Sequence, residues 1–207
     1  LGLALAAWLA AGVAIGLAGR IGLGRVSPVE SLRRAVGLPR AAWGMTAAHF
    51  GAAVLVAGLT GASAWQSEAI QVMAPGATVE LAGYAFTFEG ESEVAGPNYT
   101  ARRGTFAVTR AGREVARLVA EKRFFPSQGT WTTEAAIHTT WSADLYAVIG
   151  DPADGGAWST RIYHNPLVPW MWIGAVIMVI GGAVSLTDRR HRVGAPARRR
   201  LAAAPGD

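Results

Sequence analysis

Three long runs of apolar and small residues divide the chain of 207 residues. No Asp, Glu, Lys or Arg occurs in residues 1–19, 41–67 or 162–187. Each run reaches or exceeds the roughly 18–20 apolar residues that a helix needs to cross the hydrocarbon core of a bilayer. The pattern therefore predicts three transmembrane α-helices, over residues 1–19, 43–65 and 166–187.

The segment between the second and third runs shows the alternation that is typical of β-strands. Tyr84, Phe86 and Phe88 alternate with small or polar residues, and residues 105–109 and 113–125 flank an Ala111-Gly112 turn. Residues 131–141 and 144–149 are further candidate strands. Short strands at this spacing predict a small all-β domain over residues 66–165, either barrel-like or a sandwich.

Basic residues cluster beside the predicted helices. Residues 20–40 hold five arginines and one glutamate, and residues 188–207 hold six arginines and two aspartates. Residues 68–161, in contrast, hold eight basic and eleven acidic residues. Because basic residues in short loops mark the cytoplasmic side, we expect the loop 20–42 and the tail 188–207 to be cytoplasmic and the β-domain to be periplasmic.

Composition narrows the possible classes of protein. Apolar residues make up 51% of the chain, charged residues 16%, and there is no cysteine. This excludes a disulfide scaffold and a cysteine-ligated metal module, and it argues against a disordered protein. The net charge of +5 lies in arginine clusters that flank the predicted helices, so we predict a lipid bilayer and not nucleic acid as the partner of these basic segments.

His49 is the most informative candidate residue, because it lies inside the second predicted helix. Polar residues in a membrane span are costly and usually face a helix bundle or a ligand. Small residues around it, such as Gly44 and Ala48, would let another helix or a flat ligand approach closely. The residues alone leave two interpretations open: ligation of a haem iron, or a hydrogen bond to another helix.

The other histidines carry less information. His138 lies in the β-segment, His164 precedes the third helix, and His191 lies among arginines of the tail. No Ser/His/Asp order, phosphate-binding loop or His-x-x-x-His metal spacing occurs. We therefore assign no catalytic residue, and we give no role to His138 or His164.

Several stretches, taken in order, resemble the C-terminal part of the CcmF family of bacterial cytochrome c maturation proteins, the haem lyase subunit of a multi-protein assembly system. The stretches are residues 43–45, 48–51, 85–88, 96–99, 121–125, 133–137, 144–146, 161–163, 166–168 and 170–172.

The resemblance implies a multi-pass protein of the bacterial inner membrane. Such proteins take haem from a haem chaperone and, with other maturation subunits, support its attachment to the Cys-x-x-Cys-His motif of apocytochrome c in the periplasm. They also hold a haem b within the membrane. The fragment alone is not expected to be active, and a non-catalytic docking module for assembly partners is the alternative.

For this chain, the resemblance implies that His49 is an axial ligand of the haem b iron. The second axial ligand and the substrate-haem pocket of the family match nothing in these 207 residues. We therefore expect this chain to supply one haem ligand and a periplasmic β-domain.

Overall fold

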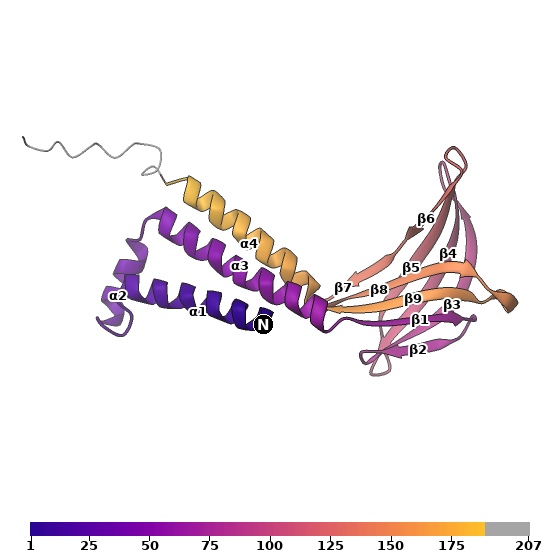
Figure 1. Ribbon diagram of the computed structural model, residues 1–207, viewed down its shortest axis with the longest axis horizontal. Coiled ribbons are helices and arrows are strands. Elements are labelled where there is room, and N and C mark those ends of the chain that lie inside the picture. Colours follow the sequence, from indigo (N-terminus) through magenta and orange to yellow (C-terminus); the bar gives the residue numbers. More distant parts are fainter. Residues whose placement is uncertain (189–207) are drawn as a thin grey trace, which may run out of the picture. The chain divides into compact units, whose positions relative to one another are not determined.

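The computed structural model describes residues 1–188, and Figure 1 shows the order of its elements. The chain forms two compact units. The sandwich unit contains residues 1–6 and 54–174, and the helical unit contains residues 7–53 and 175–188. The predicted tail 188–207, including His191, lies outside the described residues except for Asp188.

Three helices are long and apolar enough to cross a membrane among the described residues. They are α1 (Gly2–Ile21), α3 (Arg40–Ala64) and α4 (Val168–Leu186). A fourth helix, α2 (Pro28–Val36), lies within the segment that the sequence led us to expect as a loop. Ser27 caps α2 by accepting a hydrogen bond from the Glu30 backbone N–H, and Pro28 occupies its first turn, where no N–H donor is needed.

Among residues 1–188, nine strands form two antiparallel sheets. The four-stranded sheet has the order β1-β9-β8-β7, and the five-stranded sheet has the order β2-β3-β4-β5-β6. Their bounds are β1 (Ser67–Met73), β2 (Thr78–Leu81), β3 (Tyr84–Ala95), β4 (Thr100–Arg110), β5 (Arg113–Phe125), β6 (Thr130–Glu134), β7 (Ala136–Thr139), β8 (Ala143–Pro152) and β9 (Trp158–Pro166). The all-β domain between the second and third apolar helices is thus confirmed, and its two separate sheets make it a sandwich (Figure 1).

The predicted hairpin is formed by β4 and β5. Arg110 pairs with Arg113 across the Ala111-Gly112 turn, and both turn residues have positive φ angles, 50° and 76°. Positive φ at both central residues matches the twist of a two-residue hairpin. The predicted strand over residues 131–141 is wrong in one respect, because the chain leaves the five-stranded sheet after Glu134 and enters the four-stranded sheet at Ala136.

The core of the sandwich consists of the side chains that alternate inward on both sheets. Phe86, Phe88 and Phe106 are fully buried, and Phe88 lies 5.1 Å from Phe106 between ring centroids. Leu145, Ile149 and Ile162 close the core from the four-stranded sheet. Tyr84, Phe86 and Phe88, whose alternation predicted a strand, are the buried side chains of β3.

The first and last strands of the sandwich pair with each other. Ser67 of β1 lies opposite His164 of β9. Within the same unit, the end of α3 packs against the start of α4: a Cβ added at Gly58 would lie 2.6 Å from the Met171 backbone nitrogen. The sandwich is therefore an insertion between two helices that are already in contact at their sandwich ends.

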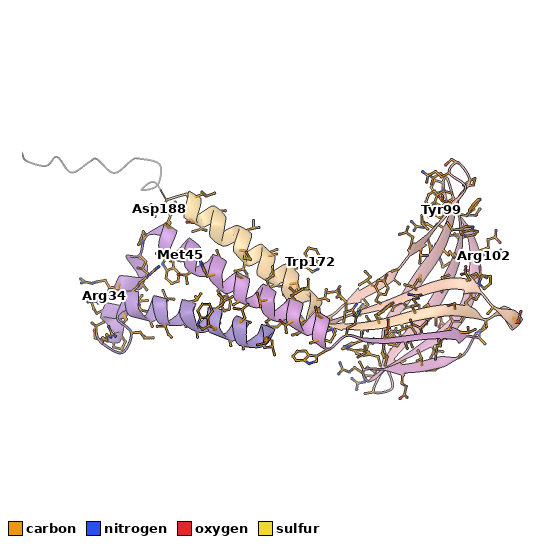
Figure 2. All side chains as sticks on the ribbon, in the orientation of Figure 1. Arg34, Met45, Tyr99, Arg102, Trp172 and Asp188 are labelled. Atoms are coloured by element: carbon orange, nitrogen blue, oxygen red, sulfur yellow. The ribbon has the colours of Figure 1, made fainter. Side chains whose placement is uncertain are left out.

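The helical unit contains a second close approach of α3 to α4. A Cβ added at Gly44 would lie 2.5 Å from the Gly181 carbonyl oxygen, and one added at Gly181 would lie 2.5 Å from the Ala48 backbone nitrogen. Small residues allow this contact between the two backbones. Asp188, labelled in Figure 2, accepts a hydrogen bond of 3.0 Å from the Ala41 N–H in the first turn of α3. A carboxylate at this position also complements the positive end of the helix dipole.

Candidate functional site

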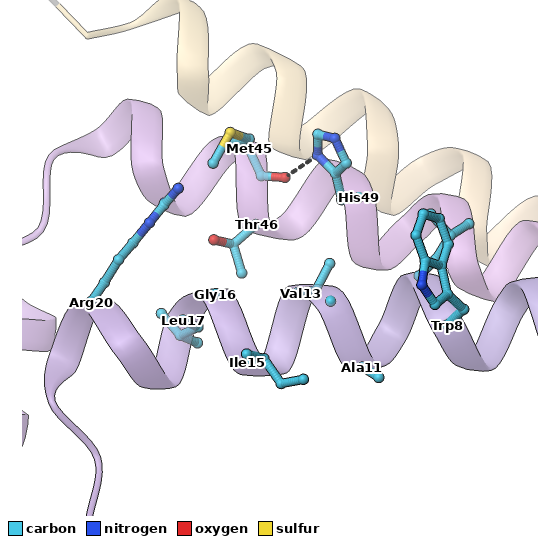
Figure 3. A pocket seen from close by; sticks show the side chains of 12 residues that line it. Trp8, Ala11, Val13, Ile15, Gly16, Leu17, Arg20, Met45, Thr46 and His49 are labelled. Carbon is cyan, nitrogen blue, oxygen red and sulfur yellow. Dashed lines mark hydrogen bonds between the residues drawn. The ribbon is translucent and has the colours of Figure 1, made fainter. Parts of the chain in front are cut away.

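A groove of about 360 Å³ lies between α1 and α3 in the helical unit. This volume falls within the range of about 300–1,000 Å³ that is typical of small-molecule pockets. Its lining is mostly apolar, with His49, Thr46 and Arg20 as its polar members (Figure 3). The remaining lining residues are Trp8, Leu9, Ala11, Gly12, Val13, Ile15, Gly16, Leu17 and Met45.

The ring of His49 is oriented by its own helix. Its Nδ1 lies 2.8 Å from the Met45 carbonyl oxygen, one turn earlier (Figure 3). Because a carbonyl oxygen only accepts, Nδ1 must carry the proton in this hydrogen bond. In the neutral ring, Nε2 is then left with a free lone pair. Histidines that bind a metal through one ring nitrogen commonly donate the other N–H to a backbone carbonyl, and His49 has this arrangement.

Glycines of α1 leave space beside His49. A Cβ built at Gly12 or at Gly16 meets no other heavy atom within 4 Å. Both glycines line the groove, so α1 presents bare backbone there. The flat, apolar floor suits a planar ligand better than a branched one.

The groove fits a haem in its chemistry. A neutral imidazole with a free Nε2 is a common iron ligand, and the mostly apolar lining would cover a porphyrin. Within residues 1–188, no group of three or more His, Cys, Asp or Glu side chains could hold a metal ion.

The structure does not bring the other histidines into this groove. His138 lies on β7, opposite Leu145. His164 lies 5.9 Å from the Tyr84 ring, between centroids, and its Nδ1 is buried without a partner. Burial, and then the charge of Arg110, lower the pKa of His164 below its usual value, so this imidazole is neutral at pH 7.

The most concentrated charges of the sandwich belong to a structural network. Glu121 is buried and accepts from Arg103 and Arg123, each with a nitrogen–oxygen distance of 2.8 Å. Arg123 also lies 4.7 Å above the ring of Tyr99, which is labelled in Figure 2. Burial raises the pKa of Glu121, but the hydrogen bonds from the two arginines outweigh burial and lower it overall. Every charge here has a partner, so we assign no ligand to this network.

Comparison with known proteins identifies the family. Residues 64–166 match the family model described as the CcmF C-terminal β-sandwich. The chain belongs to the CcmF family. These residues coincide with the β-domain, and the match together with the three apolar helices indicates an inner-membrane protein.

Curated relatives extend the similarity into the helices. The cytochrome c-type biogenesis protein CycK of Rhizobium meliloti is 42% identical over 203 residues, which is 98% of this chain and 30% of the relative. The CcmF proteins of Pseudomonas aeruginosa and Escherichia coli are 43% and 38% identical over 75% and 93% of this chain. This chain covers 24% and 28% of those two relatives, so it spans less than a third of each relative's length.

A solved structure supports the fold. The cytochrome c haem lyase CcmF matches with a TM-score of 0.69 and 21% identity over 90% of this chain and 30% of that protein. At this identity the match is evidence for the fold alone. The resemblance inferred from the sequence, to the C-terminal part of CcmF, is confirmed.

Sequence reasoning singled out His49 but missed two other polar features of the groove. The Met45 carbonyl, which orients His49, has no signal in the side-chain pattern because it belongs to the backbone. Arg20 did have a signal, since it is the only charged residue of α1, but it was interpreted as a marker of the cytoplasmic side.

Proposed function

We propose that this chain is part of a haem-handling subunit of the cytochrome c maturation system, with His49 as an axial ligand of a haem b. The observation that carries the proposal is the hydrogen bond from His49 Nδ1 to the Met45 carbonyl, which leaves the Nε2 of a residue lining an apolar groove available as a ligand. The names of the relatives, which describe cytochrome c biogenesis and haem lyase proteins, agree with this function.

In this proposal the residues of the chain bind and orient a ligand. Met45 fixes the tautomer and direction of the His49 ring, and Gly12 and Gly16 keep the floor of the groove flat. The mostly apolar lining would contact the apolar face of the ligand. A bound haem b would supply an electron for reducing the iron of the substrate haem, whose vinyl groups react with the cytochrome thiols.

The proposal assigns the attachment reaction to the lyase complex, with a haem chaperone, apocytochrome c and other maturation subunits as partners. We assign no catalytic residue to this chain. The sandwich would lie in the periplasm, and the α2 segment with the basic tail would lie in the cytoplasm. Alkaline phosphatase fused after residue 130 should then be active, and the same fusion after residue 195 should be inactive.

The ligand assignment is tested by substitution in the purified protein. His49→Ala should remove the absorption signal of the reduced haem b, and added imidazole should restore it by entering the vacated space. His138→Ala, which removes a histidine outside the groove, is the matched control and should keep the signal. A full signal in His49→Ala would contradict the assignment.

The alternative function is a non-catalytic docking module for assembly partners. Under this hypothesis His49→Ala would mature cytochromes at the normal level, while substitutions on the surface of the sandwich would abolish partner binding. The free Nε2 of His49 favours the haem-handling function over this alternative.

A further inference from the structure

Arg20 is the only charged residue of α1. It lies in the last turn of α1 and lines the apolar groove that also contains His49. Among residues 1–188 no carboxylate forms an ion pair with it, whereas Arg33 and Arg34 of α2 both pair with Glu30. The Arg20 side chain is exposed and can therefore reach a ligand bound in the groove.

Met45 shows where Arg20 lies along α3. Arg20 and Met45 line the groove together, and both also line a second hollow that contains Pro39 and Ser185. Met45 precedes His49 by one turn, or about 6 Å of helix rise. The guanidinium therefore lies beyond His49 toward the Arg40 end of α3, and it extends from α1 toward α3 in Figure 3.

We propose that Arg20 binds a carboxylate of the ligand that His49 coordinates. A ligand that reaches both residues needs a metal centre at His49, an apolar body over Gly12 and Gly16, and a negative group one turn away. Haem has this form, because its two propionates lie on one edge of the macrocycle. This inference rests on the proposed function. It adds the orientation of the haem, whose propionate edge would face Arg20.

Arginine is well suited to this role. Its guanidinium donates two parallel hydrogen bonds to a carboxylate and stays charged at every relevant pH. A competing interpretation is that Arg20 extends past the groove to lipid phosphates, as long basic side chains near helix ends often do. The two interpretations differ in one respect: only carboxylate binding makes the affinity for haem depend on free propionates.

The experiment compares two probes on one protein. The protein as expressed from its gene is purified without haem and titrated with haem and with haem dimethyl ester, whose propionates carry no charge. Binding is followed by the absorption signal that His49→Ala removes. Wild type should bind haem on the order of tenfold more tightly than the ester, as expected for a hydrogen-bonded charge pair. Arg20→Gln should bind the two probes alike.

Two further variants complete the design. Arg20→Lys keeps a charge and should retain part of the preference for haem. Arg25→Gln makes the same change outside the groove and should keep the full preference. Equal binding of both probes by wild type, or an undiminished preference in Arg20→Gln, would overturn the role of Arg20 while leaving His49 as a ligand. Binding of neither probe by wild type would overturn the proposed function and this inference together.

Discussion

The sandwich and the apolar helices place large apolar side chains in opposite environments. Phe86, Phe88 and Phe106 of the sandwich are 0% exposed, whereas Val179 and Trp172 of α4 are 71% and 69% exposed. The sandwich buries its apolar surface in its own core, as a domain in water must. The helices leave theirs exposed, and a bilayer can cover such surface because lipid is as apolar as the side chains. The distribution of apolar side chains in this chain is therefore suited to water in the sandwich and to lipid in the helices.

The largest expected effect is in the sandwich core. Phe106→Ala should lower the free energy of unfolding of the sandwich by about 3–5 kcal/mol, since it removes buried apolar surface and leaves a cavity. Urea titration followed by proteolysis of the sandwich would measure this. Val179→Ala, at a position that is 71% exposed, is the contrasting variant and should change the stability by less than about 0.5 kcal/mol. Similar losses in both variants would remove the contrast.

The next prediction introduces a charge instead of a cavity, and here the larger effect is expected in the apolar helix and the smaller one in the sandwich. Val179→Asp should make membrane insertion of α4 less favourable by about 3 kcal/mol, because the carboxylate would enter hydrocarbon. The fraction of α4 that inserts into microsomes measures this. Val119→Asp makes the same change at a sandwich position that is 44% exposed to water. There the cost should be about 1 kcal/mol or less, mostly from strand propensity.

A smaller effect tests the contact between α3 and α4. Gly181→Ala should destabilise the helical unit by about 1–3 kcal/mol, because its Cβ would meet the backbone of Ala48. Gly182→Ala is an adjacent control, since a Cβ there meets nothing within 4 Å. The thermal unfolding midpoint in detergent should fall for the first variant only. Equal midpoints would show that the two helices are not held together at Gly181.

The smallest effect concerns the charge network of the sandwich. The folded pKa of Glu121 lies below its ordinary value of 4.5, so its contribution to stability is complete above pH 4.5. The contribution is lost as the pH falls through the lowered folded pKa. Glu121→Gln should therefore flatten the acid limb of the stability profile of the sandwich. An unchanged acid limb in this variant would exclude Glu121 as its source.

Much of this architecture could be predicted because the signals are local. Charge-free runs predicted three apolar helices, and the alternation of Tyr84, Phe86 and Phe88 predicted a buried strand face. The expected loop contained α2, whose signal was present: Ser27 and Glu30 have the spacing of a capping box. The crossing between sheets at Ala135 had no such signal, because the alternation says nothing about which sheet a strand joins.

The candidate site was predictable in one residue only. A histidine in an apolar helix is rare enough to be noticed, so His49 was identified without a structure. Its tautomer depends on a backbone oxygen, and the proposed role of Arg20 depends on how α1 faces α3. Which side of α1 packs against α3 depends on helix packing. The residue types along one helix do not specify it.

The pairing of β1 with β9 also bears on how the chain folds. It joins residues about 100 positions apart, and closing a loop of that length in a free chain costs about 4 kcal/mol of entropy. The contact of α3 with α4 at Gly58 already holds the two ends of this loop together. Association of α3 with α4 in the bilayer would thus reduce the entropy cost of pairing β1 with β9. The sandwich should therefore fold faster when both flanking helices are inserted.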